Sequence, residues 1–135
     1  MPDHPIDDLF GDEPAALPLG AQAVLLRGFA LAQAQALVQG VRQVALRAPW
    51  RHMQTPGGKA MSVAMTGCGP LSWVSDRRGY RYADRDPLTG RPWPAMPAVF
   101  ARLARAAAQQ AGFAHFAPDA CLVNRYEPGA RMSLH

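Results

Sequence analysis

The chain has 135 residues and a mass of 14.6 kDa, which is the size of one domain on a prior of roughly 100–200 residues per domain. With 49% hydrophobic residues, 18% charged residues and a mean hydropathy of -0.12, the composition excludes a chain that is disordered throughout and a chain embedded in a membrane. The N-terminal segment has no basic region followed by an apolar stretch, so we expect a soluble, cytoplasmic protein. We also expect it to be a monomer.

The formal charge of +4 conceals an asymmetry along the chain. Five of the ten acidic residues lie within the first 13 positions, and no Lys or Arg precedes Arg27. Residues 14–135 therefore carry fourteen bases and five acids, a surplus of nine. Such a surplus favours an anionic partner such as nucleic acid. Codon bias is the alternative, because thirteen of the fourteen bases are Arg in an Ala-rich chain.

The first part of the chain predicts a leader, a short strand and a helix. Residues 1–17 hold three prolines and the acidic cluster, which predicts a flexible acidic leader. The apolar stretch 23–29 is typical of a strand or a buried edge segment. Residues 30–48 predict an amphipathic helix that ends before Pro49. Its expected core face comprises Ala34, Leu37, Val38, Val41, Val44, Ala45 and Ala48.

The middle of the chain alternates turns and strands. Residues 55–58 (Thr-Pro-Gly-Gly) predict a turn, and the alternation over 61–66 predicts a strand that ends at the Gly and Pro of 69–70. Cys68 and Cys121 are separated by 52 residues and form no CxxC pattern. We expect two buried free thiols rather than a disulfide framework or a zinc site.

Aromatic and cationic residues are interleaved between positions 71 and 97. In a strand, Tyr80 and Tyr82 point to one face and Arg81 to the other. A nucleotide-binding surface needs aromatic rings that stack on bases and guanidinium groups that bind phosphates. The alternative is that the aromatic residues pack a cross-strand ladder. The residues concerned are Trp73, Tyr80, Tyr82 and Trp93, with Arg77, Arg78, Arg81, Arg85 and Arg91.

The last part of the chain predicts a second helix and a hairpin. The helix runs from Pro97 to Gly112, with Arg102, Arg105 and Gln109 facing water. Residues 120–126 predict a strand, 127–130 a turn, and 131–135 the returning strand. Period-two geometry then places Leu122, Asn124 and Tyr126 on one face.

The segment from Asn124 to His135 (Asn-Arg-Tyr-Glu-Pro-Gly-Ala-Arg-Met-Ser-Leu-His) resembles the AlkB family of iron(II)- and 2-oxoglutarate-dependent dioxygenases. Further matches occur in order and at similar spacing, so the resemblance covers nearly all of the chain after the leader. These matches lie at residues 55–58, 61–66, 79–82, 91–97 and 118–121.

This resemblance implies an α+β fold. Residues 18–115 would form an N-terminal extension of helices and strands that serves as a nucleotide-recognition lid. Residues 116–135 would form the first strands of a double-stranded β-helix, or jelly roll, truncated at His135. The family's His-x-Asp pair and distal second His imply further iron ligands beyond residue 135, so we expect the 135-residue chain alone to be inactive.

The resemblance also assigns roles to individual residues. Trp73 corresponds to the ring that stacks on a flipped base, and the segment Tyr80-Arg81-Tyr82 to a substrate contact. Thr55 and Arg131 correspond to positions near the nucleic-acid backbone. The family typically has Lys at the position of Arg131, which keeps the charge but changes the hydrogen-bond geometry.

The same comparison implies Fe(II) as cofactor with 2-oxoglutarate and O2 as cosubstrates. Asn124, Arg125 and Tyr126 correspond to 2-oxoglutarate-binding residues, and His135 to the first iron ligand. The implied reaction is oxidative demethylation of 1-methyladenine and 3-methylcytosine in single-stranded or damaged DNA, or in RNA, without a membrane partner. A non-catalytic module that binds single-stranded nucleic acid is the first alternative, and a helix–sheet interaction domain with aromatic core residues is the second.

Overall fold

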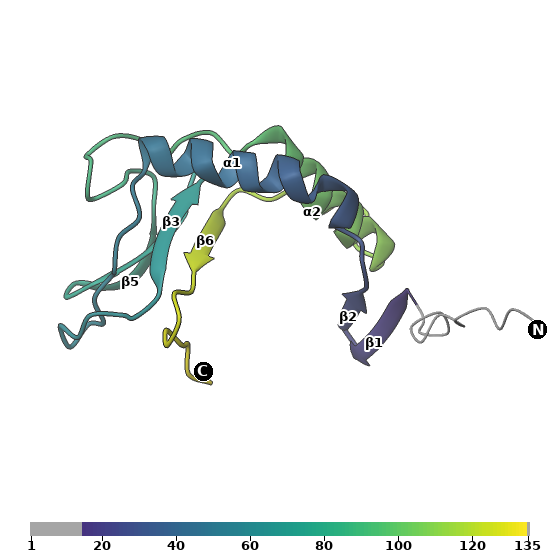
Figure 1. The fold of residues 1–135 in the computed structure, drawn as a ribbon, viewed down its shortest axis with the longest axis horizontal. Helices are drawn as coiled ribbons and strands as arrows, with labels where there is room; N and C mark the ends of the chain where they lie inside the picture. Colours follow the sequence, from purple (N-terminus) through teal and green to yellow (C-terminus); the bar gives the residue numbers. More distant parts are fainter. Residues whose placement is uncertain (1–14, 135) are drawn as a thin grey trace, which may run out of the picture.

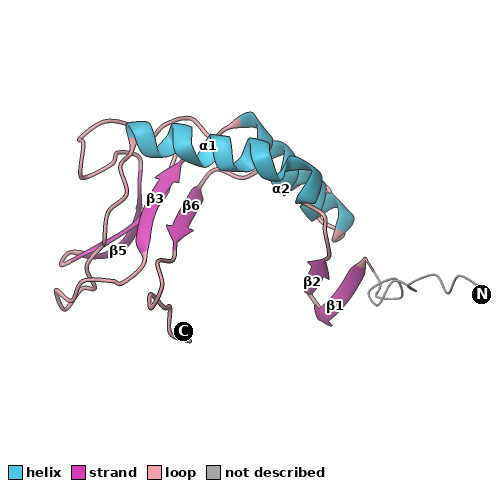
Figure 2. Cartoon of the chain, in the orientation of Figure 1, coloured by secondary structure: helices cyan, strands magenta, loops and turns pink. Residues whose placement is uncertain are grey.

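The computed structural model describes residues 15–134, and within them it contains two α-helices, one short 3-10 helix and six strands. The predicted mixture of helices and antiparallel strands is confirmed (Figures 1 and 2). In chain order the elements are β1 (Ala16–Gly20), β2 (Ala23–Leu26), η1 (Leu31–Gln33), α1 (Ala34–Arg47), β3 (Ala64–Cys68), β4 (Ser72–Asp76), β5 (Gly79–Ala83), α2 (Ala98–Gln110) and β6 (Cys121–Arg125).

The strands form three antiparallel pairs, β1–β2, β3–β6 and β4–β5. The pairs β1–β2 and β4–β5 are hairpins, whereas β3 and β6 come from distant parts of the chain. In Figure 1, α1 and α2 lie along one side of the molecule, β3, β5 and β6 extend from beneath α1, and the β1–β2 hairpin stands apart from them. The β3–β6 and β4–β5 pairs therefore form the part of the structure on which a site can be built.

Helix α1 confirms the helix predicted for residues 30–48, with η1 as its first turn. The helix ends where Ala48 adopts an extended backbone before Pro49, which cannot continue it without losing a hydrogen bond. Val44 and Ala48 are buried as predicted. Ala34 and Val38 are exposed, so the core-facing stripe is narrower than the apolar spacing implied.

Helix α2 begins after Pro97 and ends at Gln110, two residues before Gly112, whose φ of 96° favours glycine. The three polar side chains predicted to face water are exposed. Gly40 of α1 lets the helices approach closely, because a Cβ atom there would lie 2.8 Å from the Phe100 ring.

The core lies between α1, β3, β4 and the segments around them. One buried cluster contains Ala48, Val74 and Trp93. A second contains Met53, Val63 and Met65, with Trp73 packed against it. Each cluster has only three buried residues, so hydrogen bonds and ion pairs around the clusters are also needed to hold the strands in place.

Several elements differ from their predicted positions. Strand β1 begins at Ala16 and so includes the last two positions of the expected leader, while residues 1–14 lie outside the described residues. Strand β3 starts at Ala64 rather than at residue 61. The predicted returning strand is wrong for residues 131–134, which form no strand; β6 pairs with β3 instead. No helix in residues 15–134 is long and apolar enough to cross a membrane.

Candidate functional site

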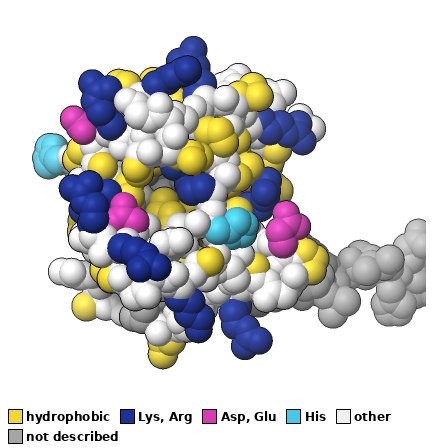
Figure 3. Space-filling model, turned by 90° about the vertical axis from the view of Figure 1, so that its left-hand side faces the viewer, with side chains coloured by type: hydrophobic (Ala, Val, Ile, Leu, Met, Phe, Trp, Pro, Cys, Tyr) yellow, Lys and Arg dark blue, Asp and Glu magenta, His cyan; other side chains and the backbone are white. Residues whose placement is uncertain are grey.

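A cavity of about 940 Å³ opens between the two central strand pairs. This volume lies in the range typical of ligand sites. Figure 3 views the end of the molecule that carries β5, where Lys and Arg side chains lie around hydrophobic ones. Five parts of the chain line the cavity: the turn segment with Thr55 and residues 59–63; β3 with Met65; the β4–β5 hairpin with Trp73, Tyr80 and Tyr82; the β6 region with Ala120, Leu122 and Asn124; and residues 131–133.

The β4–β5 hairpin presents three aromatic rings to this cavity. Trp73 lies directly opposite Tyr82 in the strand register, and its ring stacks on Tyr80 with centroids 5.5 Å apart and planes at 20°. Tyr80 and Tyr82 remain 62% and 65% exposed. The cross-strand ladder is therefore present, but it lies on a face open to solvent. Trp93, by contrast, is a core residue.

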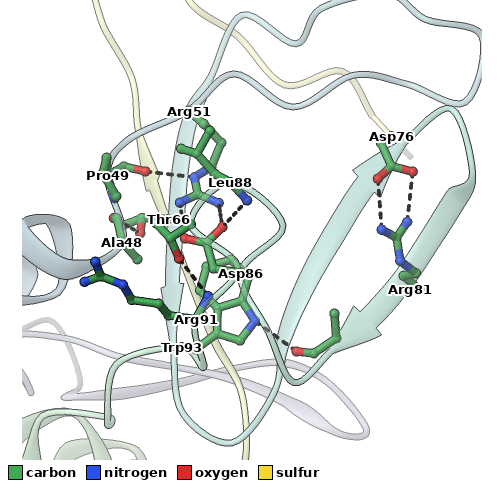
Figure 4. Close-up of polar contacts among 12 residues, drawn as sticks. Ala48, Pro49, Arg51, Thr66, Asp76, Arg81, Asp86, Leu88, Arg91 and Trp93 are labelled. Atoms are coloured by element: carbon green, nitrogen blue, oxygen red, sulfur yellow. Dashed lines mark hydrogen bonds and ion pairs between the residues drawn. The ribbon is translucent and has the colours of Figure 1, made fainter.

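Arg81 points away from this face, as the strand alternation predicted. Its guanidinium donates two hydrogen bonds to Asp76, each 2.9 Å long (Figure 4). These bonds, with a further one from the Arg78 amide, lower the pKa of Asp76 to about 2. Arg81 is not among the residues that line the cavity, although the family resemblance placed it with the substrate contacts.

The Asp76–Arg81 pair should make the folding stability of the chain depend on pH in the acidic range. The folded-state pKa of Asp76 lies near 2, below its ordinary value of 3.8, so the ionised carboxylate stabilises the fold above about pH 4. This contribution disappears as the pH falls through the folded-state value. In Asp76→Asn we expect a small loss of stability at pH 7 that shrinks steadily as the pH falls from about 4 to 2, measured from urea midpoints across this range. A deficit that stays constant with pH would contradict the assignment.

The base of the same hairpin is tied down by Arg51 and Asp86. The guanidinium donates to both carboxylate oxygens at 2.6 and 2.7 Å, and the two side chains are only 12% and 1% exposed (Figure 4). Arg51 also lies 5.2 Å from the Trp93 ring centroid, and the Trp93 indole donates to the Ala83 carbonyl at 2.9 Å. Burial raises the pKa of Asp86, but its hydrogen bonds from Arg51 and the Leu88 amide outweigh this and lower the pKa overall.

Strand β6 brings Leu122 and Asn124 to the cavity, as the predicted alternation required. The Oδ1 atom of Asn124 is buried and has no hydrogen-bond partner within the described structure. A buried amide oxygen without a partner is costly unless a hydrogen-bond donor from a ligand or water satisfies it. Tyr126 follows the end of β6, does not line the cavity, and donates its hydroxyl to the Met132 sulfur at 3.9 Å.

Arg125 is directed elsewhere. Its guanidinium lies 4.6 Å from the centroid of the Trp50 ring, and its Nε atom is 3.4 Å from a Glu127 carboxylate oxygen. These contacts occupy the side chain on the opposite side of β6 from Asn124, since adjacent strand residues point to opposite faces.

Thr55 and Arg131 both reach the cavity, from segments far apart in sequence. The predicted turn at 55–58 is confirmed by the bond from the Gly58 amide to the Thr55 carbonyl at 2.8 Å. Ser62 and Arg131 exchange two hydrogen bonds between the Ser62 hydroxyl and the Arg131 backbone, at 3.1 and 3.3 Å. This contact fixes residue 131 beside the turn without any strand pairing.

Sequence reasoning missed Lys59, Met61 and Met132 as lining residues. Lys59 is the one Lys of the chain and directly follows the Gly-Gly turn, and this position indicates an exposed cation at a loop tip. No comparable signal existed for the two methionines, because apolar residues are equally typical of a core.

The described residues do not complete a metal centre. Among residues 15–134, no three His, Cys, Asp or Glu side chains gather where they could hold an ion. His52 lies exposed, with Nδ1 3.0 Å from the Met61 carbonyl oxygen. His135, the candidate iron ligand, lies outside the described residues.

The geometry defines a mixed α/β protein with an open cavity between its two central strand pairs, lined by three aromatic rings from the β4–β5 hairpin and by Leu122 and Asn124 from β6. A family model described as the 2OG-Fe(II) oxygenase superfamily matches residues 22–135, and the chain belongs to this superfamily. It is 58% identical over 129 residues to the alpha-ketoglutarate-dependent dioxygenase AlkB of Salmonella typhimurium and 54% identical over 129 residues to that of Escherichia coli.

Each of these two alignments covers 95% of this chain and 60% of the relative. An AlkB homolog of Caulobacter vibrioides is 52% identical over 101 residues, which is 75% of this chain and 44% of the relative. The chain therefore spans about 60% of the length of the first two curated relatives. The predicted resemblance to the AlkB family is confirmed.

Proposed function

We propose that this chain supplies the nucleotide-recognition lid and the first jelly-roll strands of an AlkB-like dioxygenase that demethylates alkylated bases. The substrates are 1-methyladenine and 3-methylcytosine in single-stranded DNA or RNA, with residues 18–115 as extension and lid and 116–135 as the opening of the jelly roll. One observation carries this proposal: Trp73, Tyr80, Tyr82, Thr55, Arg131 and Asn124 line a single cavity.

The aromatic wall suits a base removed from its stack. Extracting a base costs a few kcal/mol, and stacking on an aromatic ring offsets this by about 1–3 kcal/mol per base. The Trp73 ring is held against the second core cluster, so it offers a face with little remaining freedom. Arg131 and Lys59 at the same cavity supply positive charge for the phosphates that flank the base.

The Asn124 side of the cavity suits a small polar cosubstrate. 2-Oxoglutarate offers only hydrogen-bond acceptors, so we assign the side-chain NH2 group of Asn124 as a donor to it. Bound Fe(II) with 2-oxoglutarate would supply the oxidation of the N-methyl group, which leaves as formaldehyde. The described residues hold no complete set of iron ligands, so their role is to bind and orient the base and the cosubstrate.

Replacing Trp73 by Ala tests the proposal. If the ring stacks on the base, Trp73→Ala weakens binding of a 1-methyladenine-containing single strand by about 1–3 kcal/mol, which is roughly 5- to 150-fold in Kd. Fluorescence anisotropy with a labelled oligonucleotide measures this change. Trp50→Ala is the matched control, because Trp50 lies under Arg125 and outside the cavity. Equal losses in both variants, or none in Trp73→Ala, would refute the stacking role.

A non-catalytic module for single-stranded nucleic acid is the second candidate. The observation that favours it is that the cavity brings three aromatic rings together with Lys59 and Arg131. The two candidates differ in their response to 2-oxoglutarate. Binding of 2-oxoglutarate that is lost in Asn124→Ala, measured by calorimetry, supports the dioxygenase, whereas oligonucleotide binding with no affinity for 2-oxoglutarate supports the module.

A further inference from the structure

The two cysteines of the chain face each other across the β3–β6 pair. Cys68 is the last residue of β3 and Cys121 the first residue of β6, and the strand register places them directly opposite one another. Directly opposed residues in an antiparallel pair have Cα atoms roughly 4.5–5.5 Å apart, which lies within the roughly 4.4–6.8 Å that a disulfide spans. The chain has no other cysteine with which either could pair.

The two thiols occupy different environments. Cys68 is 0% exposed, whereas Cys121 is only half-buried. The interaction between the two thiols lowers the pKa of Cys121 to about 7 and, together with burial, raises that of Cys68. Cys121 is therefore the thiol that reaches solvent as a thiolate, and Cys68 is the protonated thiol behind it.

We propose that Cys68 and Cys121 form a reversible disulfide that links β3 to β6, with Cys121 as the thiol that reacts first with an oxidant and Cys68 as the thiol that resolves the product. Both cysteines are free in the structure, so it represents the reduced form. The juxtaposition that carries this proposal is independent of nucleic-acid binding and of the dioxygenase reaction.

A peroxide is the oxidant class for this step. The Cys121 thiolate attacks one peroxide oxygen and the O–O bond breaks, which gives a sulfenic acid and a hydroxide. The hydroxide takes up the proton that the Cys121 thiol released on ionisation and becomes the first water. The Cys68 sulfur, losing its proton, then attacks the Cys121 sulfur, and the S–O bond breaks to release a second water. In sum, two thiols are oxidised to one disulfide while hydrogen peroxide is reduced to two waters. A dithiol reductant reverses the reaction through a mixed disulfide.

The link would fasten the strand pair that forms the floor of the cavity. Met65 of β3 and Asn124 of β6 are direct partners in the same register, three positions from the cysteines. Closing a loop of 52 intervening residues restricts the unfolded chain, so the oxidised form is expected to unfold at a higher temperature than the reduced form.

The primary experiment uses the unmodified chain. After treatment with hydrogen peroxide under dilute conditions, mass spectrometry should show a monomer that has lost two hydrogen atoms, and a non-reducing digest should contain a peptide pair joining Cys68 to Cys121. Dithiothreitol should restore the original mass and both titratable thiols. A folded chain that yields no such pair, or only disulfide-linked dimers, overturns the proposal.

Two variants test the order of events. In Cys68→Ser, peroxide should leave Cys121 as a sulfenic acid that dimedone traps, because no second thiol resolves it. In Cys121→Ser, the buried Cys68 should remain unlabelled in the folded chain and become labelled in denaturant. Equal labelling of the two folded variants would overturn the assignment of attacking and resolving thiols, while the unmodified chain still tests the disulfide itself.

Discussion

Replacing Asp86 by Ala should destabilise the chain by about 3–5 kcal/mol, because it leaves the Arg51 guanidinium buried without its counter-charge. Arg51 is 12% exposed and the carboxylate 1% exposed, so water cannot replace the two lost bonds of 2.6 and 2.7 Å. The carboxylate also accepts a bond from the Leu88 amide at 2.8 Å, which is lost as well. Urea unfolding followed by circular dichroism measures the change.

The matched control is Asp76→Ala at the other end of the same hairpin. Asp76 makes the same two-bond contact with Arg81, but these side chains are 35% and 29% exposed, so removing the carboxylate should cost far less. A double variant, Arg51→Ala with Asp86→Ala, should lose less stability than the sum of the two single variants, since it removes both charges. Additive losses would show that the two side chains act separately.

The same variant should reduce oligonucleotide binding at temperatures where it remains folded. Asp86 lies just beyond β5, and its pairing with Arg51 ties the base of the aromatic hairpin to the segment before β3. Loosening the base lets Trp73 and Tyr80 lose their fixed orientation. If a folded Asp86→Ala chain binds the oligonucleotide as tightly as the unmodified chain, the ion pair does not position the binding site.

Replacing Gly67 by Ala should cost about 3 kcal/mol, the upper end of the usual range for overpacking a core. A Cβ atom at this position of β3 would overlap the Ser72 hydroxyl and lie 2.8 Å from the Ser72 Cβ and 3.2 Å from the Cys121 carbonyl. Ser72 is itself fully buried and the Cys121 carbonyl belongs to the β6 backbone, so neither can move aside without disturbing a strand.

Two controls isolate this clash. Gly20→Ala should have a small effect, because no heavy atom lies within 4 Å of a Cβ at that position of β1. Adding Ser72→Gly to Gly67→Ala removes the overlapping side chain and should recover part of the lost stability. Thermal unfolding of the variants measures both effects. A Gly67→Ala chain as stable as Gly20→Ala would show that β3 and β4 separate more easily than their packing indicates.

Local patterns determined the helices, the 55–58 turn and the direction of the β5 side chains. Each depends on residues a few positions apart: apolar spacing and the boundaries at Pro49 and Gly112 for the helices, glycines for the turn, and strict alternation for Tyr80, Arg81 and Tyr82. The structure has these features close to where the sequence predicts them. The matching motifs also determined the family, because several of them occur in order and in register.

Only the tertiary structure decided the partners of these elements. The segment after β6 reads locally as the second strand of a hairpin, yet β6 pairs with β3, which ends 52 residues before β6 begins. Strand pairing depends on which face is buried against distant residues, and no local pattern carries that information.

Contacts between distant segments also explain how the residues of the candidate site come together. The sequence selected Thr55, Trp73, Asn124 and Arg131 one by one, but their common cavity exists because two strand pairs meet. It also included Arg81 and Arg125, which the fold turns toward Asp76 and Trp50. The sequence by itself thus determined which chemical groups this protein carries and which local elements hold them. Long-range packing decided which of those groups meet, because contacts between distant segments form only when a shared core brings their faces together.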